Sequence, residues 1–219
     1  MDVPEQTLHN QLKAWYLKTG DQLEGMVEGF IVDIVRGDLL IEIQTGNFSM
    51  IRSKLEELLK THKIRLVYPI PERKWVSRVD GEKTSKRRSP KRGRFEEVFN
   101  ELIYIPHVLA NPSFSLEVLL VHMEETLVNN GLGSWRRKGW SIQDRRLLEV
   151  VDHILFEKPA DYLLLFPEKI QGNFTSKDLA KTSNLSLSLA RKMVYCLSCT
   201  GIIREEGKCG RSKLYRRSL

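Results

Sequence analysis

Two acidic residues, Asp33 and Glu42, lie in short apolar segments that are joined by Gly37 and Asp38. Glycine and aspartate tolerate a positive φ, so this pair predicts a two-residue hairpin turn, and counting back from the turn places Asp33 opposite Glu42. Like charges that face each other across a sheet destabilise it unless a cation lies between them. A bound divalent metal would supply that cation. A solvent-exposed strand face would also tolerate the two acids, and a three-residue turn would offset them.

The elements around this hairpin follow from hydrophobic periodicity. Apolar residues recur at helical spacing over 7–18, 50–61 and 95–109, whereas 63–70 and 115–128 are short, apolar and rich in residues that favour strands. Strands separated by helices imply parallel pairing, so residues 1–130 are expected to form an α/β domain, a mixed sheet flanked by helices. Because side chains alternate along a strand, one face of the hairpin is expected to carry Ile31, Asp33, Val35, Leu40, Glu42 and Gln44.

A basic segment interrupts this domain. Residues 83–94 hold seven basic side chains and no acidic one, which equals the formal net charge of +7 of the whole chain. Its polar composition, broken by proline and glycine, predicts that residues 80–94 form a mobile inserted loop. Such a loop is either a solvated linker or an arm that binds nucleic-acid phosphates. The candidate phosphate-binding residues are Lys86, Arg87, Arg88, Lys91, Arg92 and Arg94.

Composition narrows the class of protein. The 219 residues are 41% hydrophobic, and no apolar run is long enough to cross a membrane. The first six residues lack the basic and apolar regions of a signal peptide, and three cysteines cannot all pair, so a cytoplasmic protein is expected. Cys196 and Cys199 form a C-x-x-C motif without a second pair, which favours a position in a buried helix over a zinc site.

With these elements in order, residues 1 to about 128 resemble the PD-(D/E)xK superfamily, the restriction-endonuclease-like nucleases that include Holliday-junction resolvases. The resemblance rests on Val32-Asp33 and on Glu42-Ile43-Gln44 at the two signature positions, followed by the expected helix and strand. It implies a restriction-endonuclease-like sheet and a nuclease site. Gln44 stands where lysine is usual in this superfamily.

The resemblance also implies roles for these residues. Asp33 and Glu42 would bind Mg²⁺ or Mn²⁺ through hard oxygen ligands, with the carbonyl of Ile43 close to the ion. Gln44 could orient the attacking water but cannot stabilise negative charge as lysine does, so Lys54 or Arg52 of the following helix would have to supply the positive charge. Glu24 is the candidate for a further acidic residue ahead of the hairpin, with Glu28 close behind it.

The last third of the chain predicts a second module. A helix is expected from Trp140 to Leu155, then helices over 176–182 and 186–200 and a hairpin over 202–217, with residues 131–141 as the joint. This order resembles a winged helix-turn-helix domain over residues 142–219, which implies a helix in the major groove and a wing on the DNA backbone. The candidate DNA-binding residues are Ser186, Ser188, Arg191, Lys192, Lys208, Arg211 and Lys213.

These features together predict a metal-dependent nuclease that a winged-helix domain directs to DNA. A homodimer would give it two sites for the two strands of a duplex. Gln44 favours an alternative, a catalytically inactive nuclease fold that is retained as a DNA-binding or regulatory protein. A module that binds only other proteins is the third possibility. A requirement for both acids in metal binding would separate the first two, and salt-dependent DNA binding would exclude the third.

Overall fold

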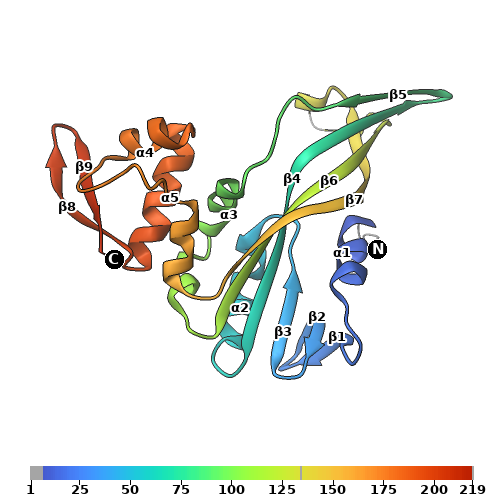
Figure 1. Ribbon diagram of the computed structural model, residues 1–219. Helices are drawn as coiled ribbons and strands as arrows, with labels where there is room; N and C mark the ends of the chain where they lie inside the picture. Colours follow the sequence, from blue (N-terminus) through green and yellow to red (C-terminus); the bar gives the residue numbers. More distant parts are fainter. Residues whose placement is uncertain (1–6, 134, 219) are drawn as a thin grey trace.

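The computed structural model describes residues 7–133 and 135–218, with the side chain of residue 136 left out. The first six residues, on which the expectation of no signal peptide rests, lie outside this part. Within it, the main feature is a mixed sheet of seven strands in the order β1-β2-β3-β4-β6-β7, with β5 paired to β4 (Figure 1). Its strands are β1 (Gln22–Val27), β2 (Phe30–Arg36), β3 (Leu39–Ile43), β4 (Lys63–Asp80), β5 (Lys83–Arg88), β6 (Phe114–Asn129) and β7 (Trp140–Phe156). The pairs β3–β4 and β4–β6 are parallel and the others antiparallel, so the predicted α/β class with a mixed sheet is confirmed.

Helices cover both faces of this sheet. Its two faces contribute to separate apolar cores, one with Leu8 and Leu12 of α1 and one with Leu55 and Leu58 of α2. The predicted helix over 95–109 is broken into short pieces, because Pro106 cannot continue a helix that began at Phe95. The helical segments of this part are α1 (Thr7–Tyr16), η1 (Phe48–Ile51), α2 (Arg52–Leu58), η2 (Phe95–Val98), α3 (Phe99–Leu102), η3 (Pro106–Ala110) and η4 (Trp135–Arg137).

The β2–β3 hairpin has the predicted turn. Arg36 pairs with Leu39 around Gly37, whose φ is 58°. The ladder ends at Ile34 and Ile41, one pair short of the two acids. Val32 packs in the core on the α2 side and Ile34 in the core on the α1 side, so side-chain alternation breaks at Asp33. The expectation that one regular face carries all six side chains is therefore wrong.

The basic segment is a loop only in part, because residues 89–94 are irregular whereas residues 83–88 are not. Residues 83–88 form the strand β5, which pairs antiparallel with residues 75–80 of β4 and exposes all six of its side chains. Charged side chains are tolerated on a strand at the edge of a sheet, where they also discourage edge-to-edge aggregation. The strand β4 is correspondingly longer than the predicted 63–70. Pro69 and Pro71 do not end it, because β3 pairs with it only up to Val67 and β5 only from Trp75, so neither proline faces a ladder on that side.

The predicted helix from Trp140 to Leu155 is also wrong, because these residues form β7 and pair antiparallel with β6. The β6–β7 register shifts at three places, and such bulges let apolar residues at irregular spacing face the sheet. Consequently, residues 142–156 belong to the sheet and not to the C-terminal module. The predicted joint 131–141 is the loop that connects β6 to β7 together with the first residues of β7.

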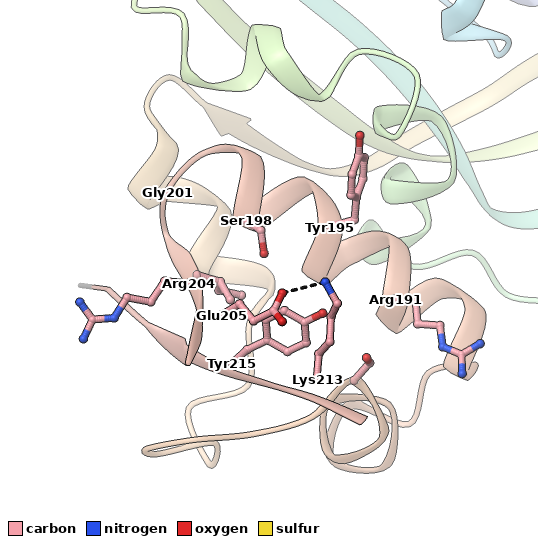
Figure 2. Close-up of a pocket in the computed structure, with 10 residues that line it drawn as sticks. Arg191, Tyr195, Ser198, Gly201, Arg204, Glu205, Lys213 and Tyr215 are labelled. Atoms are coloured by element: carbon pink, nitrogen blue, oxygen red, sulfur yellow. Dashed lines mark hydrogen bonds and ion pairs between the residues drawn. The ribbon is translucent and has the colours of Figure 1, made fainter. Parts of the chain in front are cut away.

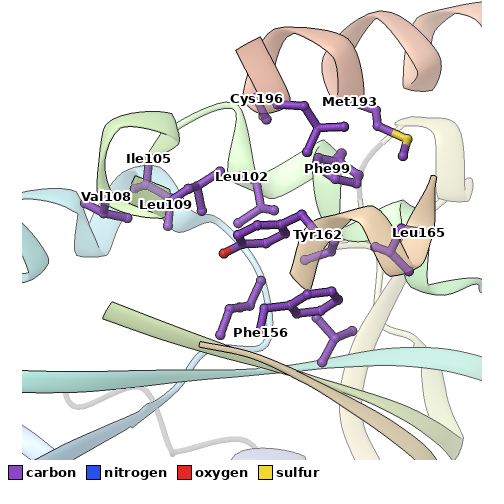
Figure 3. Packing of buried hydrophobic residues seen from close by; sticks show 14 of the residues in the cluster. Phe99, Leu102, Ile105, Val108, Leu109, Phe156, Tyr162, Leu165, Met193 and Cys196 are labelled. Carbon is purple, nitrogen blue, oxygen red and sulfur yellow. The ribbon is translucent and has the colours of Figure 1, made fainter. Parts of the chain in front are cut away.

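The C-terminal part contains two helices joined by a turn and followed by a hairpin, and it shares its core with the sheet domain. Phe156 at the end of β7 stacks on Tyr162 with ring centroids 4.8 Å apart, and Phe99 and Met193 are buried in the same cluster (Figure 3). The predicted helical position of the C-x-x-C motif is confirmed, with Cys196 buried and Cys199 exposed. The elements of this part are η5 (Pro159–Leu165), α4 (Ser176–Ser183), α5 (Leu187–Cys199), β8 (Ile203–Cys209) and β9 (Ser212–Arg217).

A buried ion pair fixes the end of α1 to the hairpin. Arg36 donates to both carboxylate oxygens of Asp21, at 2.8 and 2.7 Å, and to the backbone oxygen of Tyr16 at 2.8 Å. The Asp21 side chain is only 2% exposed. The hydrogen bonds from Arg36 lower the pKa of Asp21 to about 2.

Asp21→Asn is therefore expected to lower the free energy of unfolding at pH 7 by about 1 to 2 kcal/mol. A lowered carboxyl pKa stabilises the folded state above the ordinary pKa near 4, and this contribution is lost as the pH falls towards about 2. Urea unfolding between pH 3 and pH 7 measures the effect. The exposed Asp38→Asn is the control, and a loss for Asp21→Asn that does not depend on pH would contradict the assignment.

Candidate functional site

The carboxylate of Asp33 and the backbone of Ile43 meet at the end of the hairpin. Ile43 N–H donates to Asp33 Oδ2 at 2.8 Å, where the regular ladder has ended. His9 of α1 approaches the same place, and its Nε2 lies 3.2 Å from Asp33 Oδ2 and 2.9 Å from the carbonyl oxygen of Ile43. Thus two of the three oxygen ligands predicted from the resemblance, Asp33 and the Ile43 carbonyl, lie close together. The Nε2 nitrogen of His9 contacts both of them.

The second acid, Glu42, is paired with Lys54 of α2. Lys54 Nζ donates to Glu42 Oε2 and to the backbone oxygen of Ile31, at 2.6 Å in both cases. Both side chains are largely buried. Lys54 was one of two residues suggested to replace the missing signature lysine, and it does reach the acid. The other, Arg52, pairs with Glu56 on the surface of the same helix.

The two carboxyl groups influence each other. Burial raises the pKa of Glu42, the negative charge of Asp33 raises it further, and the result lies above the ordinary value in spite of Lys54. Burial also acts to raise the pKa of Asp33, but the contacts with His9 and Ile43 N–H and the charge of Lys13 outweigh it, so that this pKa is lowered. The pair therefore holds one carboxyl group whose pKa is lowered and one whose pKa is raised, both in a partly buried position.

Gln44 and Glu24, the other two predicted catalytic residues, form their hydrogen bonds with residues outside the acidic pair. Gln44 Nε2 donates to the backbone oxygen of Gly46 at 2.5 Å, so its amide is used within its own turn. Glu24 lies on β1 and accepts from Lys13 Nζ at 2.9 Å. Sequence reasoning did not identify His9 and Lys13, whose four-residue spacing on α1 places them on one side of the helix.

A metal site is not preformed by acidic and histidine side chains. Across residues 7–133 and 135–218, no group of three or more His, Cys, Asp or Glu is arranged to hold a metal ion. The donor chemistry nevertheless suits a hard divalent cation, because Asp33, Glu42 and the Ile43 carbonyl all offer oxygen. Lys54 and His9 contact these same oxygens.

Most cations of the predicted phosphate-binding segment have acidic partners. Lys86 pairs with Glu124 of β6 at 2.9 Å, across the intervening strand β4, and Arg94 donates to the backbone oxygen of Ser183 at the end of α4 at 2.9 Å. Lys91 and Arg92 pair with Glu97 and Glu72, and Arg94 also with Glu96. Arg87 and Arg88 are exposed, and the described part of the chain offers them no ion pair.

In the C-terminal part, the predicted DNA-binding residues are only partly brought together. Lys192 Nζ donates to Asn100 at 2.8 Å, so this lysine faces α3 and not solvent, contrary to the expectation. Ser186 caps α5 by accepting from Leu189 N–H at 3.2 Å, and Ser188 is exposed in the next turn. Lys208 and Arg211 are exposed around the tip of the β8–β9 hairpin.

Arg191 and Lys213 do line one groove, which lies between α5 and the β8–β9 hairpin (Figure 2). The groove has a volume of about 390 Å³ and also contains Arg204, Tyr195 and Tyr215. Lys213 is held by Glu205 at 2.7 Å. The groove therefore combines basic and aromatic side chains beside α5.

Comparisons with known proteins place the chain in a family without assigning a site. The family model described as "Domain of unknown function (DUF8091)" matches residues 6–157. This range ends where β7 ends, in agreement with the sheet and not with a boundary at residue 141. A protein of Treponema pallidum (strain Nichols), described as "Uncharacterized protein", is 30% identical over 222 residues, covering 97% of this chain and 85% of that protein.

No solved structure matches the chain. None of the helices in the described part is long and apolar enough to cross a membrane. Because the family model covers well over half of the chain, the protein belongs to the family described as Domain of unknown function (DUF8091).

Proposed function

We propose that this protein is a metal-dependent nuclease that hydrolyses phosphodiester bonds of DNA. The order of elements supports the proposal, since α1, three antiparallel strands, α2 and the parallel strand β4 follow one another as in the restriction-endonuclease-like core. The observation that carries it is the contact of Lys54 with Glu42, because it brings a cation from α2 to the acidic pair where Gln44 cannot provide one.

Asp33, Glu42 and the carbonyl of Ile43 would hold Mg²⁺ or Mn²⁺. The metal, when bound, would polarise the phosphate and activate a water molecule. Asp33 and the Ile43 carbonyl already contact one shared nitrogen of His9, so their oxygens lie close enough to share a cation. Lys54 would stabilise the negative charge that develops on the phosphate, since its charge is buried beside the site and therefore weakly screened.

The C-terminal part would bind the DNA that the site cleaves. We assign it as a winged helix because two helices joined by a turn precede a two-stranded hairpin. The groove that contains Arg191 and Lys213 would contact phosphates, which position a protein on DNA without reading its sequence. Binding should therefore weaken steeply as salt is raised.

Lys54→Met tests the proposal directly. The variant keeps the apolar stem of the side chain but removes the charge, and we expect cleavage of supercoiled plasmid in Mg²⁺ or Mn²⁺ to fall about 100-fold. Mn²⁺ binding, measured by calorimetry, should be retained or become tighter because a competing cation has left Glu42. Lys60→Met, which removes a surface lysine just after α2, is the matched control and should cleave normally.

A second substitution separates a catalytic from a structural role of Lys54. Gln44→Lys places the charge at the signature position, so the double variant Lys54→Met/Gln44→Lys should recover at least about a tenth of the wild-type cleavage rate. Wild-type cleavage by Lys54→Met would remove this lysine from the mechanism.

The alternative function is a catalytically inactive nuclease fold that binds DNA. It is favoured by the pairing of both acids with side chains of this chain, Asp33 with His9 and Glu42 with Lys54. If wild type cleaves neither plasmid nor a four-way junction in either metal but still binds DNA in a salt-dependent manner, the alternative replaces the nuclease.

A further inference from the structure

The outer parts of β4, β5, β6 and β7 form an extension that neither the acidic site nor the C-terminal groove uses. We define it as the β-arm, residues 72–88 and 122–147; in Figure 1 it extends away from the C-terminal helices. We propose that the β-arm binds nucleic acid where a duplex meets unpaired bases, with β5 contacting phosphates and Trp135 stacking on an unpaired base. This inference rests on the proposed action on DNA and names the class of DNA that the protein would select.

Two loops meet at the end of the β-arm. The turn between β4 and β5 and the loop between β6 and β7 are joined by Asn129 Nδ2, which donates to Asp80 at 3.4 Å. The guanidinium of Arg78 lies over the ring of Trp140 at 5.2 Å. Hence the cations of β5 and the 130–139 loop belong to one surface, although some fifty residues separate them in the sequence.

The β-arm carries most of the net positive charge. It holds twelve basic and six acidic side chains, so it contributes +6 of the formal +7 of the chain. The two glutamates that β6 contributes to the β-arm are each neutralised by two cations, Glu124 by Lys86 and Arg146 and Glu125 by Lys74 and Arg145. These two glutamates are therefore matched by cations of the arm itself, and the exposed Arg87 and Arg88 of β5 remain available to an anionic partner.

The loop at the end of the arm adds exposed apolar side chains to this charge. Trp135 is 83% exposed and Leu132 is 84% exposed, whereas large apolar residues normally lie in a core. An indole ring stacks on a base only if the base is not already stacked on both sides, as in single strands and at duplex ends. Leu132, three residues earlier in the same loop, is suited to lie against the last base pair of a duplex.

An anionic membrane is the other partner that cations and a tryptophan could fit. The shape of the charged surface favours nucleic acid. Four of the six residues of the edge strand β5 are basic, so positive charge is present along its whole length, and such a strand suits a linear series of phosphates. Only the loop at the end is apolar, which suits one stacked base better than insertion along a membrane surface.

Binding without metal tests the inference independently of cleavage. Full-length protein in EDTA is titrated against a fluorescent forked DNA, a duplex ending in two unpaired strands, and against a blunt duplex of the same length. Trp135→Ala is expected to weaken binding to the fork about 10-fold or more and to change duplex binding by less than about twofold. Trp135→Phe keeps an aromatic ring and should retain most of the affinity, and Trp15→Ala, which removes an exposed tryptophan of α1, is the control.

The charge of β5 is tested by Arg87→Ala/Arg88→Ala. This double variant should weaken binding to both DNAs and reduce the slope of log affinity against log salt by about 2. Fork binding by Trp135→Ala that equals wild type would overturn the inference. So would Trp135-dependent binding to phosphatidylcholine–phosphatidylserine vesicles without Trp135-dependent DNA binding, which would assign the loop to a membrane.

The same titrations separate this inference from the proposed function. If the wild type binds no DNA at all, both fail. If duplex binding persists and depends on Arg191 and Lys213 but not on the β-arm, only the role of the arm is lost.

Discussion

Replacing Asp33 by asparagine is expected to reduce metal-dependent DNA cleavage at least about 1000-fold. The asparagine oxygen can still accept the Ile43 N–H, so the end of the hairpin should keep its structure while the charge that would hold the proposed divalent metal is lost. Glu42→Gln should have a comparable effect, because it removes the second anionic ligand. The rate of plasmid relaxation in Mg²⁺ and Mn²⁺ measures both variants, and Mn²⁺ binding by calorimetry should weaken in parallel.

The control for this experiment is Asp38→Asn, which neutralises an exposed acid in the turn of the same hairpin. It should cleave and bind metal as wild type does. Unchanged cleavage in Asp33→Asn would show that the acidic pair is not the catalytic site. Cleavage lost together with folding, detected as a lowered melting temperature, would require Glu42→Gln to carry the test alone.

Phe99→Ala is expected to lower the free energy of unfolding by about 3 to 5 kcal/mol. Phe99 is fully buried in α3 and lies in the apolar cluster that joins the sheet to α5, near Leu102, Tyr162 and Met193 (Figure 3). Removing its ring loses buried apolar area and leaves a cavity that the packed helices cannot close. Chemical denaturation followed by circular dichroism gives the value.

The matched control is Tyr104→Ala, which truncates a partly exposed aromatic residue just after the same helix and should cost much less. Because the cluster is continuous between the two parts of the chain, we expect wild type and both variants to unfold in one transition. Separate transitions for the sheet and the C-terminal part would contradict a shared core.

Local signals in the sequence were sufficient for several elements. The Gly37-Asp38 turn could be predicted because positive φ is a property of the residues themselves, and the structure has the turn at that position. The helices α1, α2 and α5 follow from periodicity, because each buries one side against a core. The burial of Cys196 follows from the same reasoning.

Strand pairing over long distances could not be predicted in the same way. A segment as basic as 83–88 has no preference for a strand by itself, and it becomes one only because the long strand β4 offers a free edge beside it. Residues 140–156 have a spacing that fits a helix, but pairing with the whole length of β6 and three register shifts make them a strand. The misplaced domain boundary follows from this single error.

The candidate site likewise combines features that could be predicted from the sequence with contacts that depend on the tertiary structure. The sequence by itself determined the acidic pair and the neighbouring helix with Lys54, because both depend on spacing within a short stretch of chain. Only the tertiary structure decided what each acid contacts. His9 contacts Asp33, which is 24 residues away in the sequence. Lys54 donates to Glu42, and Lys13 donates to Glu24. These contacts depend on how α1 and α2 pack on opposite faces of the sheet, and packing is set by the whole core and not by any one segment.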